Sequence, residues 1–196
     1  MNTLIELNFG NPVAWFRQND VPGIQDVTTA SNPGIYLWTV QTDSGELVYY
    51  VGETGRSFVA RMAEHLTQQL SGMYHIYEPE SFRNGVKHAL WRGAYGQEKE
   101  PSGVAGFLDL LPTIAPSLAS FVRLMRFRLA PLDAERRLRE RIEVAIALHL
   151  KDQPDPIGSF QEEGVRYRRR LPDEVLVTVT CRADGVIFGL PASLDA

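Results

Sequence analysis

The sequence predicts an α+β protein: a small, mainly antiparallel sheet flanked by helices, with a helical insertion and a C-terminal β-hairpin. Two observations lead to this class. β-rich runs of period two occur in pairs separated by turn residues, and segments of helical periodicity lie between them. The 196 residues, 44% of them hydrophobic and 22% charged, match one globular domain. We therefore expect a single domain over residues 1–196.

The first half of the chain predicts a hairpin followed by a helix. Residues 12–19 suggest a short helix, and a loop follows. From Gly34, the runs GIYLWTVQT and LVYYVGE flank a turn at 43–45, which indicates an antiparallel hairpin. Ser57 is a suitable N-cap for a helix that extends to about Met73. Four apolar residues recur along that helix and predict one buried stripe: Phe58, Met62, Leu66 and Leu70.

The second half predicts two strands, a long helix and the closing hairpin. In order, we expect a strand within 87–95, a strand over 121–130, a helix of about eighteen residues capped by Asp133, and a hairpin of 175–181 with 186–190.

The apolar stretch 104–122 is long enough to span a membrane, but it contains Asp109, Pro112 and Pro116. We expect a pair of core helices broken at the prolines instead, and no association with a membrane.

Composition excludes several kinds of partner and site. Lys and Arg number 20 against 24 Asp and Glu, a formal net charge of −4, so any contact with nucleic acid must use a local basic patch. Cys181 is the only cysteine in the sequence, which excludes an intrachain disulfide and a cysteine-based zinc site. The N-terminus lacks the basic and apolar segments of a signal peptide. We expect a cytoplasmic protein.

Two tyrosines mark the predicted hairpin. Tyr36 ends the tripeptide GIY on the first run, and Tyr50 begins the tripeptide YVG on the second. Glycine inside a strand indicates a bulge or the close approach of another group. Cross-strand aromatic packing explains the two tyrosines by spacing alone, and a functional pair of phenols is the alternative.

Arg61 and His65 are four residues apart on the first predicted helix and therefore share one face. They lie off the apolar stripe, so we expect both side chains to be accessible. A guanidinium beside an imidazole suits a phosphate-handling site, because the guanidinium matches two phosphate oxygens in a plane. The alternative is a solvated helix face with Glu64 as the local partner.

Glu143 is the last carboxylate before the uncharged run VAIALHL of the long helix, which we expect to be buried all round. A carboxylate at the edge of a core requires a cation. Arg139, one helical turn earlier, supplies that cation in a structural interpretation, and a divalent metal supplies it in a functional one.

Together and in this order, these residues resemble the GIY-YIG nuclease family. The matching features are the GIY and YVG tripeptides, Arg61 and His65 on the following helix, and the Arg-Ile-Glu143 segment, which is similar to the family's metal-binding glutamate helix. The resemblance covers about 33–73 and 121–152. Residues 74–120 would be an insertion and 153–196 a C-terminal elaboration. Many members carry an asparagine after the glutamate helix, and residues 151–196 contain none.

The resemblance implies a metal-dependent endonuclease that hydrolyses phosphodiester bonds of nucleic acid, with DNA as the expected substrate and Mg²⁺ or Mn²⁺ as the cofactor. It implies that Tyr36 accepts the proton of the attacking water or positions that water, and that Tyr50 helps to orient it. Arg61 would neutralise charge on the scissile phosphate, His65 would assist proton transfer through Tyr36, and Glu143 would hold the metal. The alternative functions are a non-catalytic nucleic-acid-binding module and a protein-interaction module on the same fold.

Further arginines are expected to contact the nucleic-acid backbone. Arg56 lies in the turn before the first predicted helix, and four arginines around Tyr167 precede the last hairpin: Arg166, Arg168, Arg169 and Arg170. Contacts of this kind position a substrate without reading its sequence. A solvated charged surface is the other interpretation of this run. Three arginines lie on the strand expected over 121–130 and could equally contact nucleic acid or pair with acidic side chains: Arg123, Arg126 and Arg128.

Overall fold

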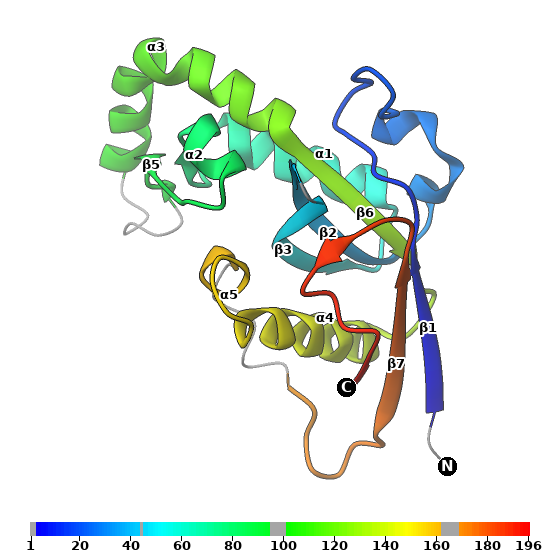
Figure 1. Cartoon of the computed structure of the whole chain (residues 1–196). Helices are drawn as coiled ribbons and strands as arrows, with labels where there is room; N and C mark the ends of the chain where they lie inside the picture. The colour runs from blue at the N-terminus through cyan, green and yellow to red at the C-terminus, as the bar shows by residue number, and fades with distance from the viewer. Residues whose placement is uncertain (1–2, 44, 95–100, 162–168) are drawn as a thin grey trace.

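The computed structural model describes residues 3–43, 45–94, 101–161 and 169–196. Within these residues the strands form three sheets, of four, three and two strands, with helices between them in the chain (Figure 1). The predicted α+β class is confirmed.

The central sheet contains the predicted hairpin. Its strand order is β6-β2-β3-β8, formed by β6 (Met125–Pro131), β2 (Gly34–Thr42), β3 (Gly45–Thr54) and β8 (Ile187–Phe188). The hairpin is β2–β3, and the strand expected over 121–130 pairs antiparallel with β2 as β6. β8 adds a short parallel pair to the other edge of β3. The sheet is therefore mainly antiparallel, as expected, and both tyrosines lie on its two inner strands.

A second sheet brings β1 (Thr3–Phe9) beside β7 (Val177–Ala183) and β9 (Ser193–Asp195), in the order β1-β7-β9 (Figure 1). β1 and β7 run parallel. The predicted C-terminal hairpin is wrong, because β7 pairs with β1 and β9 whereas β8 pairs with β3. Parallel strands need no tight turn between them, so this pairing leaves no local signal in the sequence.

Residues 12–19, all of them described, form no helix, contrary to the prediction. Val13 and Ala14 make isolated bridges with Phe127 and Gly23, and the ring of Trp15 packs edge-on against Phe127. These contacts with β6 override the local helical preference. The following loop contains two short 3₁₀ turns, η1 (Ile24–Asp26) and η2 (Thr28–Ser31).

The predicted insertion contains α2 (Pro79–Arg83) and a small sheet in which β4 (Ile76–Tyr77) pairs with β5 (Ala89–Trp91). α3 (Pro101–Leu124) follows and continues through Pro112 and Pro116 as one helix. The expectation of two helices broken at the prolines is therefore wrong. Figure 1 shows the axis of α3 changing direction along its length, which is the effect of proline inside a helix.

Among the described residues, Gly103–Leu124 is the segment long and apolar enough to cross a membrane by length and composition alone. Phe107, Ile114 and Phe121 on this segment are buried against the protein, whereas Leu108 is exposed.

α1 (Phe58–Leu70) begins as predicted, because the Ser57 hydroxyl accepts a hydrogen bond from the backbone N–H of Ala60. Its buried residues are Phe58, Met62, His65 and Gln69. The predicted stripe is therefore correct in its first half and wrong in its second, where Leu66 is half-buried and Leu70 is exposed.

α4 (Arg136–Lys151) begins after Glu135, so Asp133 does not cap it. Ile142 and Ile146 are buried, but Ala145 and Ala147 are half-buried, and the second half of the helix is not buried all round as expected. The short α5 (Ile157–Phe160) follows.

The central sheet separates two apolar cores. On one face, Tyr36 and Trp38 of β2 pack with side chains of α1 and α3. On the other face, Ile35 and Leu37 pack with α4, β1 and β7. This alternation follows from the period of two in a strand. It directs Tyr36 toward α1, where the predicted arginine and histidine lie.

Candidate active site

A β-bulge in the hairpin places two neighbouring tyrosines on one face of the sheet. The register of β3 against β2 shifts after Trp38, which pairs with Tyr50 and leaves Tyr49 as an extra residue. In a regular strand, the side chains of Tyr49 and Tyr50 would point to opposite faces of the sheet. Because of the bulge, both side chains contact the apolar core beside α1. The ring of Tyr50 consequently lies 6.2 Å from that of Tyr36, centroid to centroid.

The glycines of both tripeptides are required by close packing. Gly52 lies opposite Tyr36, and a Cβ atom there would be 2.3 Å from both Cζ and the hydroxyl oxygen of Tyr36. Gly34 has φ of +152°, and a Cβ atom there would be 2.2 Å from the carbonyl oxygen of Ala130. A side chain at position 52 would push the Tyr36 ring out of place, so this glycine positions the phenol.

α1 brings an imidazole and a guanidinium to the Tyr36 hydroxyl. His65 Nε2 lies 2.7 Å from the hydroxyl oxygen, and Arg61 Nε donates to that oxygen at 3.3 Å. The Arg61 guanidinium also pairs with Glu64 at 3.0 Å, so the predicted local pairing and the contact with Tyr36 occur together.

His65 and Arg61 differ in exposure. The Arg61 side chain keeps 31% of its surface, whereas His65 is 3% exposed. The expectation that His65 is accessible is therefore wrong. The helix presents positions 58, 62, 65 and 69 to the core, a spacing of four, three and four residues, so its buried face turns onto the histidine.

Tyr74 joins the cluster, although no motif in the sequence points to it. Its hydroxyl lies 2.9 Å from His65 Nδ1. α1 ends in a Schellman motif, in which Gly72 has φ of +73° and the Met73 N–H donates to the carbonyl of Gln68. This turn returns the chain to the helix. A glycine just after the last helical turn is the signal that could have predicted the return.

Burial dominates the electrostatics of the two hairpin phenols. It raises the pKa of Tyr36 well above its ordinary value, with Tyr50 and Glu143 acting in the same direction and Arg61 opposing. Burial, followed by the charge of Glu143, raises the pKa of Tyr50 to about 12. Both phenols are therefore protonated at neutral pH.

The same burial keeps the imidazole uncharged. It lowers the pKa of His65 from 6.5 to about 3, and the positive charge of Arg61 acts in the same direction. At neutral pH, one ring nitrogen of His65 is thus a hydrogen-bond donor and the other an acceptor.

Glu143 lies buried on α4, 3% exposed, and its charge acts on both Tyr36 and Tyr50. Arg139, one turn earlier, donates from Nε to the Glu53 carboxylate at 2.9 Å and also contacts the carbonyl of Ala134. The structural interpretation paired Arg139 with Glu143. The ion pair that Arg139 makes with Glu53 instead fixes α4 against the end of β3, which sets the position of Glu143.

The donor chemistry of this cluster fits a magnesium ion. Mg²⁺ keeps several water ligands and takes one or two carboxylates together with substrate phosphate oxygens. One buried carboxylate beside two phenols meets that requirement. Within the part of the chain that the structure describes, no group of three or more His, Cys, Asp and Glu side chains forms a metal cage. Glu143 is thus the residue that could hold the ion, with substrate completing its shell.

The arginines predicted to contact nucleic acid are only partly described. Arg56 precedes α1, has a side chain 59% exposed and pairs with Glu64 at 2.6 Å. Arg169 and Arg170 are exposed. Arg166 and Arg168 lie outside the described residues.

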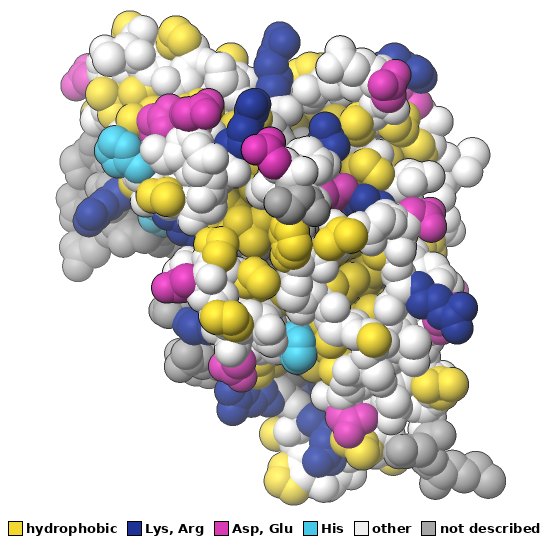
Figure 2. All heavy atoms as spheres, viewed as in Figure 1, with side chains coloured by type: hydrophobic (Ala, Val, Ile, Leu, Met, Phe, Trp, Pro, Cys, Tyr) yellow, Lys and Arg dark blue, Asp and Glu magenta, His cyan; other side chains and the backbone are white. Residues whose placement is uncertain are grey.

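Other arginines are engaged by acidic or polar groups. Arg128 on β6 is buried and pairs with Glu46 at 2.6 Å, which removes it from any surface contact with phosphate. Arg126 donates to the side chain of Gln41. Figure 2 shows basic side chains on one face of the molecule in several separate groups, most of them beside acidic ones.

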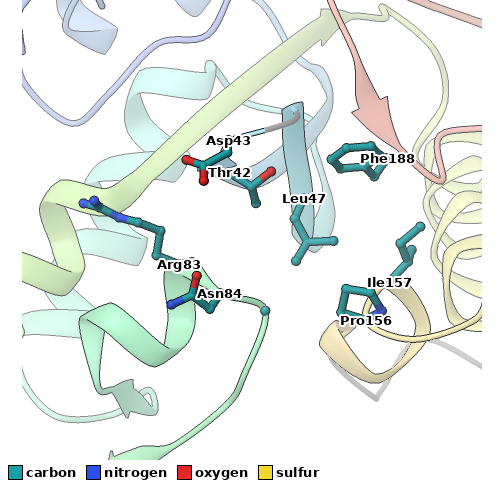
Figure 3. A pocket seen from close by; sticks show the side chains of 9 residues that line it. Thr42, Asp43, Leu47, Arg83, Asn84, Pro156, Ile157 and Phe188 are labelled. Atoms are coloured by element: carbon teal, nitrogen blue, oxygen red, sulfur yellow. The ribbon is translucent and has the colours of Figure 1, made fainter.

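A cavity of about 400 Å³ lies at the turn end of the β2–β3 hairpin (Figure 3). Thr42 and Asp43 border it on one side, and Leu47, Ile157 and Phe188 form an apolar wall. Its lining includes no residue of the tyrosine cluster, which lies toward the other end of the hairpin.

No family model, curated protein or solved structure matches this chain.

Proposed function

We propose that the protein is a metal-dependent endonuclease of the GIY-YIG type, which hydrolyses phosphodiester bonds of nucleic acid, with DNA as the expected substrate. One observation carries this proposal. The Tyr36 hydroxyl hydrogen-bonds with Arg61 and His65, while Glu143, from a helix far along the chain, acts electrostatically on the same phenol. Packing alone does not require four ionisable side chains to converge in this way, because burying them costs free energy.

Tyr36 is the group that receives the attacking water. A phenol oxygen has one proton and two lone pairs. Arg61 occupies one lone pair as a donor, and His65 Nε2 is placed to accept the phenol proton. The Tyr50 hydroxyl also hydrogen-bonds with Tyr36, and the attacking water would take its place at the second lone pair. Tyr36 thereby orients the water, and it accepts the water's proton as its own proton moves to His65.

Arg61 neutralises negative charge on the phosphate. The Arg61 side chain keeps 31% of its surface, and we propose that a phosphate oxygen approaches it there while Nε holds Tyr36. Electrostatic stabilisation by a fixed donor is a large part of catalysis in phosphoryl transfer. Tyr50, half-buried beside Tyr36, orients the water from the second side.

Glu143 would hold the divalent ion, which would supply positive charge to stabilise the leaving group. The asparagine that many GIY-YIG nucleases carry after the glutamate helix has no counterpart in residues 151–196. Arg56, Arg169 and Arg170 are exposed and are proposed to contact the backbone of the substrate.

A cleavage assay tests the proposal. Supercoiled plasmid, single-stranded DNA and RNA are each incubated with the protein in Mg²⁺ and in EDTA. We expect nicking or cutting of DNA in Mg²⁺ alone, lost in Tyr36→Phe. Binding of DNA without cleavage under all conditions would favour the non-catalytic module, and neither binding nor cleavage would favour a protein-interaction module.

A further inference from the structure

Tyr74 extends the Tyr36 hydrogen bond into a line of three side chains. The two ring nitrogens of His65 lie 2.7 Å from the Tyr36 hydroxyl and 2.9 Å from the Tyr74 hydroxyl. Tyr36 is fully buried at one end of this line, and Tyr74 is half-buried at the other. The imidazole therefore connects a fully buried phenol with a half-buried one.

The partners of Tyr36 decide where the proton of His65 lies. Arg61 Nε can only donate, so it uses a lone pair of the Tyr36 oxygen. The buried Tyr36 proton then needs an acceptor. The Tyr50 hydroxyl also hydrogen-bonds with Tyr36, but His65 Nε2, at 2.7 Å, is the more basic acceptor of the two. A neutral imidazole with a bare Nε2 carries its proton on Nδ1. Nδ1 thus donates to the oxygen of Tyr74.

We propose that Tyr74 is a positioning residue, which holds His65 in the tautomer that accepts the Tyr36 proton and so lets Tyr36 take the proton of the attacking water. This inference rests on the proposed nuclease function. Without the Tyr74 hydroxyl, the buried Nδ1–H group loses its acceptor, and the proton moves to Nε2. His65 Nε2 then donates to Tyr36 and can no longer accept its proton.

The backbone around Tyr74 is fixed independently of its hydroxyl. The Gln69 side-chain amide donates to the carbonyl of His75 at 2.9 Å, and Trp91 Nε1 donates to the carbonyl of Gly72 at 2.7 Å. These bonds tie the chain on both sides of Tyr74 to α1 and β5. Tyr74→Phe should therefore delete the hydroxyl and leave the ring in place.

The tautomer of His65 can be measured directly. The sequence has four histidines, so the ¹⁵N signals of His65 can be assigned with a His65→Gln variant. We expect the Nδ1–H tautomer in the wild type and a shift toward Nε2–H in Tyr74→Phe. Tyr77→Phe is the matched control, because it removes a phenol hydroxyl from neighbouring β4, where the ring packs with Phe82 and Phe121.

Cleavage kinetics on the same variants test the catalytic consequence. We expect Tyr74→Phe to lower kcat by about tenfold or more with KM changed by less than about twofold, and Tyr77→Phe to change neither. Because Tyr74 acts through His65, its substitution should add less than about twofold in the His65→Gln background.

Two results separate this inference from the nuclease proposal. If the wild type cleaves DNA and Tyr74→Phe changes neither the tautomer nor kcat, the inference is wrong and the nuclease function stands. If the tautomer shifts as expected and the wild type cleaves no nucleic acid, the nuclease function is wrong, and the catalytic role of Tyr74 is overturned with it.

Discussion

Gly52→Ala tests whether the Tyr36 ring is held where the chemistry requires it. The new Cβ atom would lie 2.3 Å from Cζ of Tyr36, against 3.4–4 Å for ordinary contact, so the ring must retreat by about 1 Å. Tyr36 has no exposed surface and packs against Phe58, so this movement would displace neighbouring side chains. Overpacking of this kind costs about 1–3 kcal/mol, or about 3–10 °C in Tm.

The effect on cleavage should exceed the effect on stability. A displacement of about 1 Å at a reacting group costs about 100-fold in rate, so we expect a folded protein with kcat lowered by about that factor. Thermal melts and cleavage rates on plasmid are the measurements. Gly10→Ala is the control, because a Cβ atom at Gly10 meets nothing within 4 Å and should change neither quantity. A Gly52→Ala protein with wild-type Tm and wild-type rate would refute the proposed position of the ring.

Three further predictions concern the charged groups of the cluster. Arg61→Ala should lower kcat by about 10²–10³-fold with a nearly unchanged Tm. Arg56→Ala removes the other ion-pair partner of Glu64 and should mainly raise KM, so equal effects of the two substitutions on kcat would contradict the role of Arg61. The cleavage rate should change little from pH 6 to pH 9, because the pKa of Tyr36 is raised above this range and the pKa of His65, about 3, lies below it. The protonated phenol and the neutral imidazole therefore persist throughout, and a rate that climbs about tenfold per pH unit would assign the base to a Tyr36 phenolate instead. The Tm of Glu143→Gln should not rise on addition of Mg²⁺, whereas the wild-type Tm should, because the amide lacks the charge that would hold the ion; an equal rise for both proteins would contradict the metal site.

Local sequence signals predicted the elements that carry the site. The turn at 43–45, the period-two runs and the Ser57 cap were sufficient for the β2–β3 hairpin and the start of α1, because each depends on residues close in the chain. The burial of His65 was not predictable from the apolar stripe, because two polar residues, His65 and Gln69, complete the buried face of α1.

Elements set by distant contacts escaped prediction. β1 and β7 pair across most of the chain, and no turn residue records that pairing. The non-helical conformation of residues 12–19 depends in part on the bridge between Val13 and Phe127 of β6, which lies over a hundred residues later. Tyr74 belongs to the same class, because its role follows from a hydrogen bond that depends on how Gly72 reverses the chain.

The most direct test of the central claim is cleavage of supercoiled plasmid by the purified protein, measured in Mg²⁺ and in EDTA, with Glu143→Gln in parallel. If Tyr36, Arg61, His65 and Glu143 form a phosphodiesterase site, the wild type nicks or cuts the plasmid in Mg²⁺ only, and Glu143→Gln binds DNA without cutting it. A folded wild-type protein that leaves plasmid, single-stranded DNA and RNA intact in Mg²⁺ and in Mn²⁺, or a Glu143→Gln variant that cuts at the wild-type rate, would contradict it.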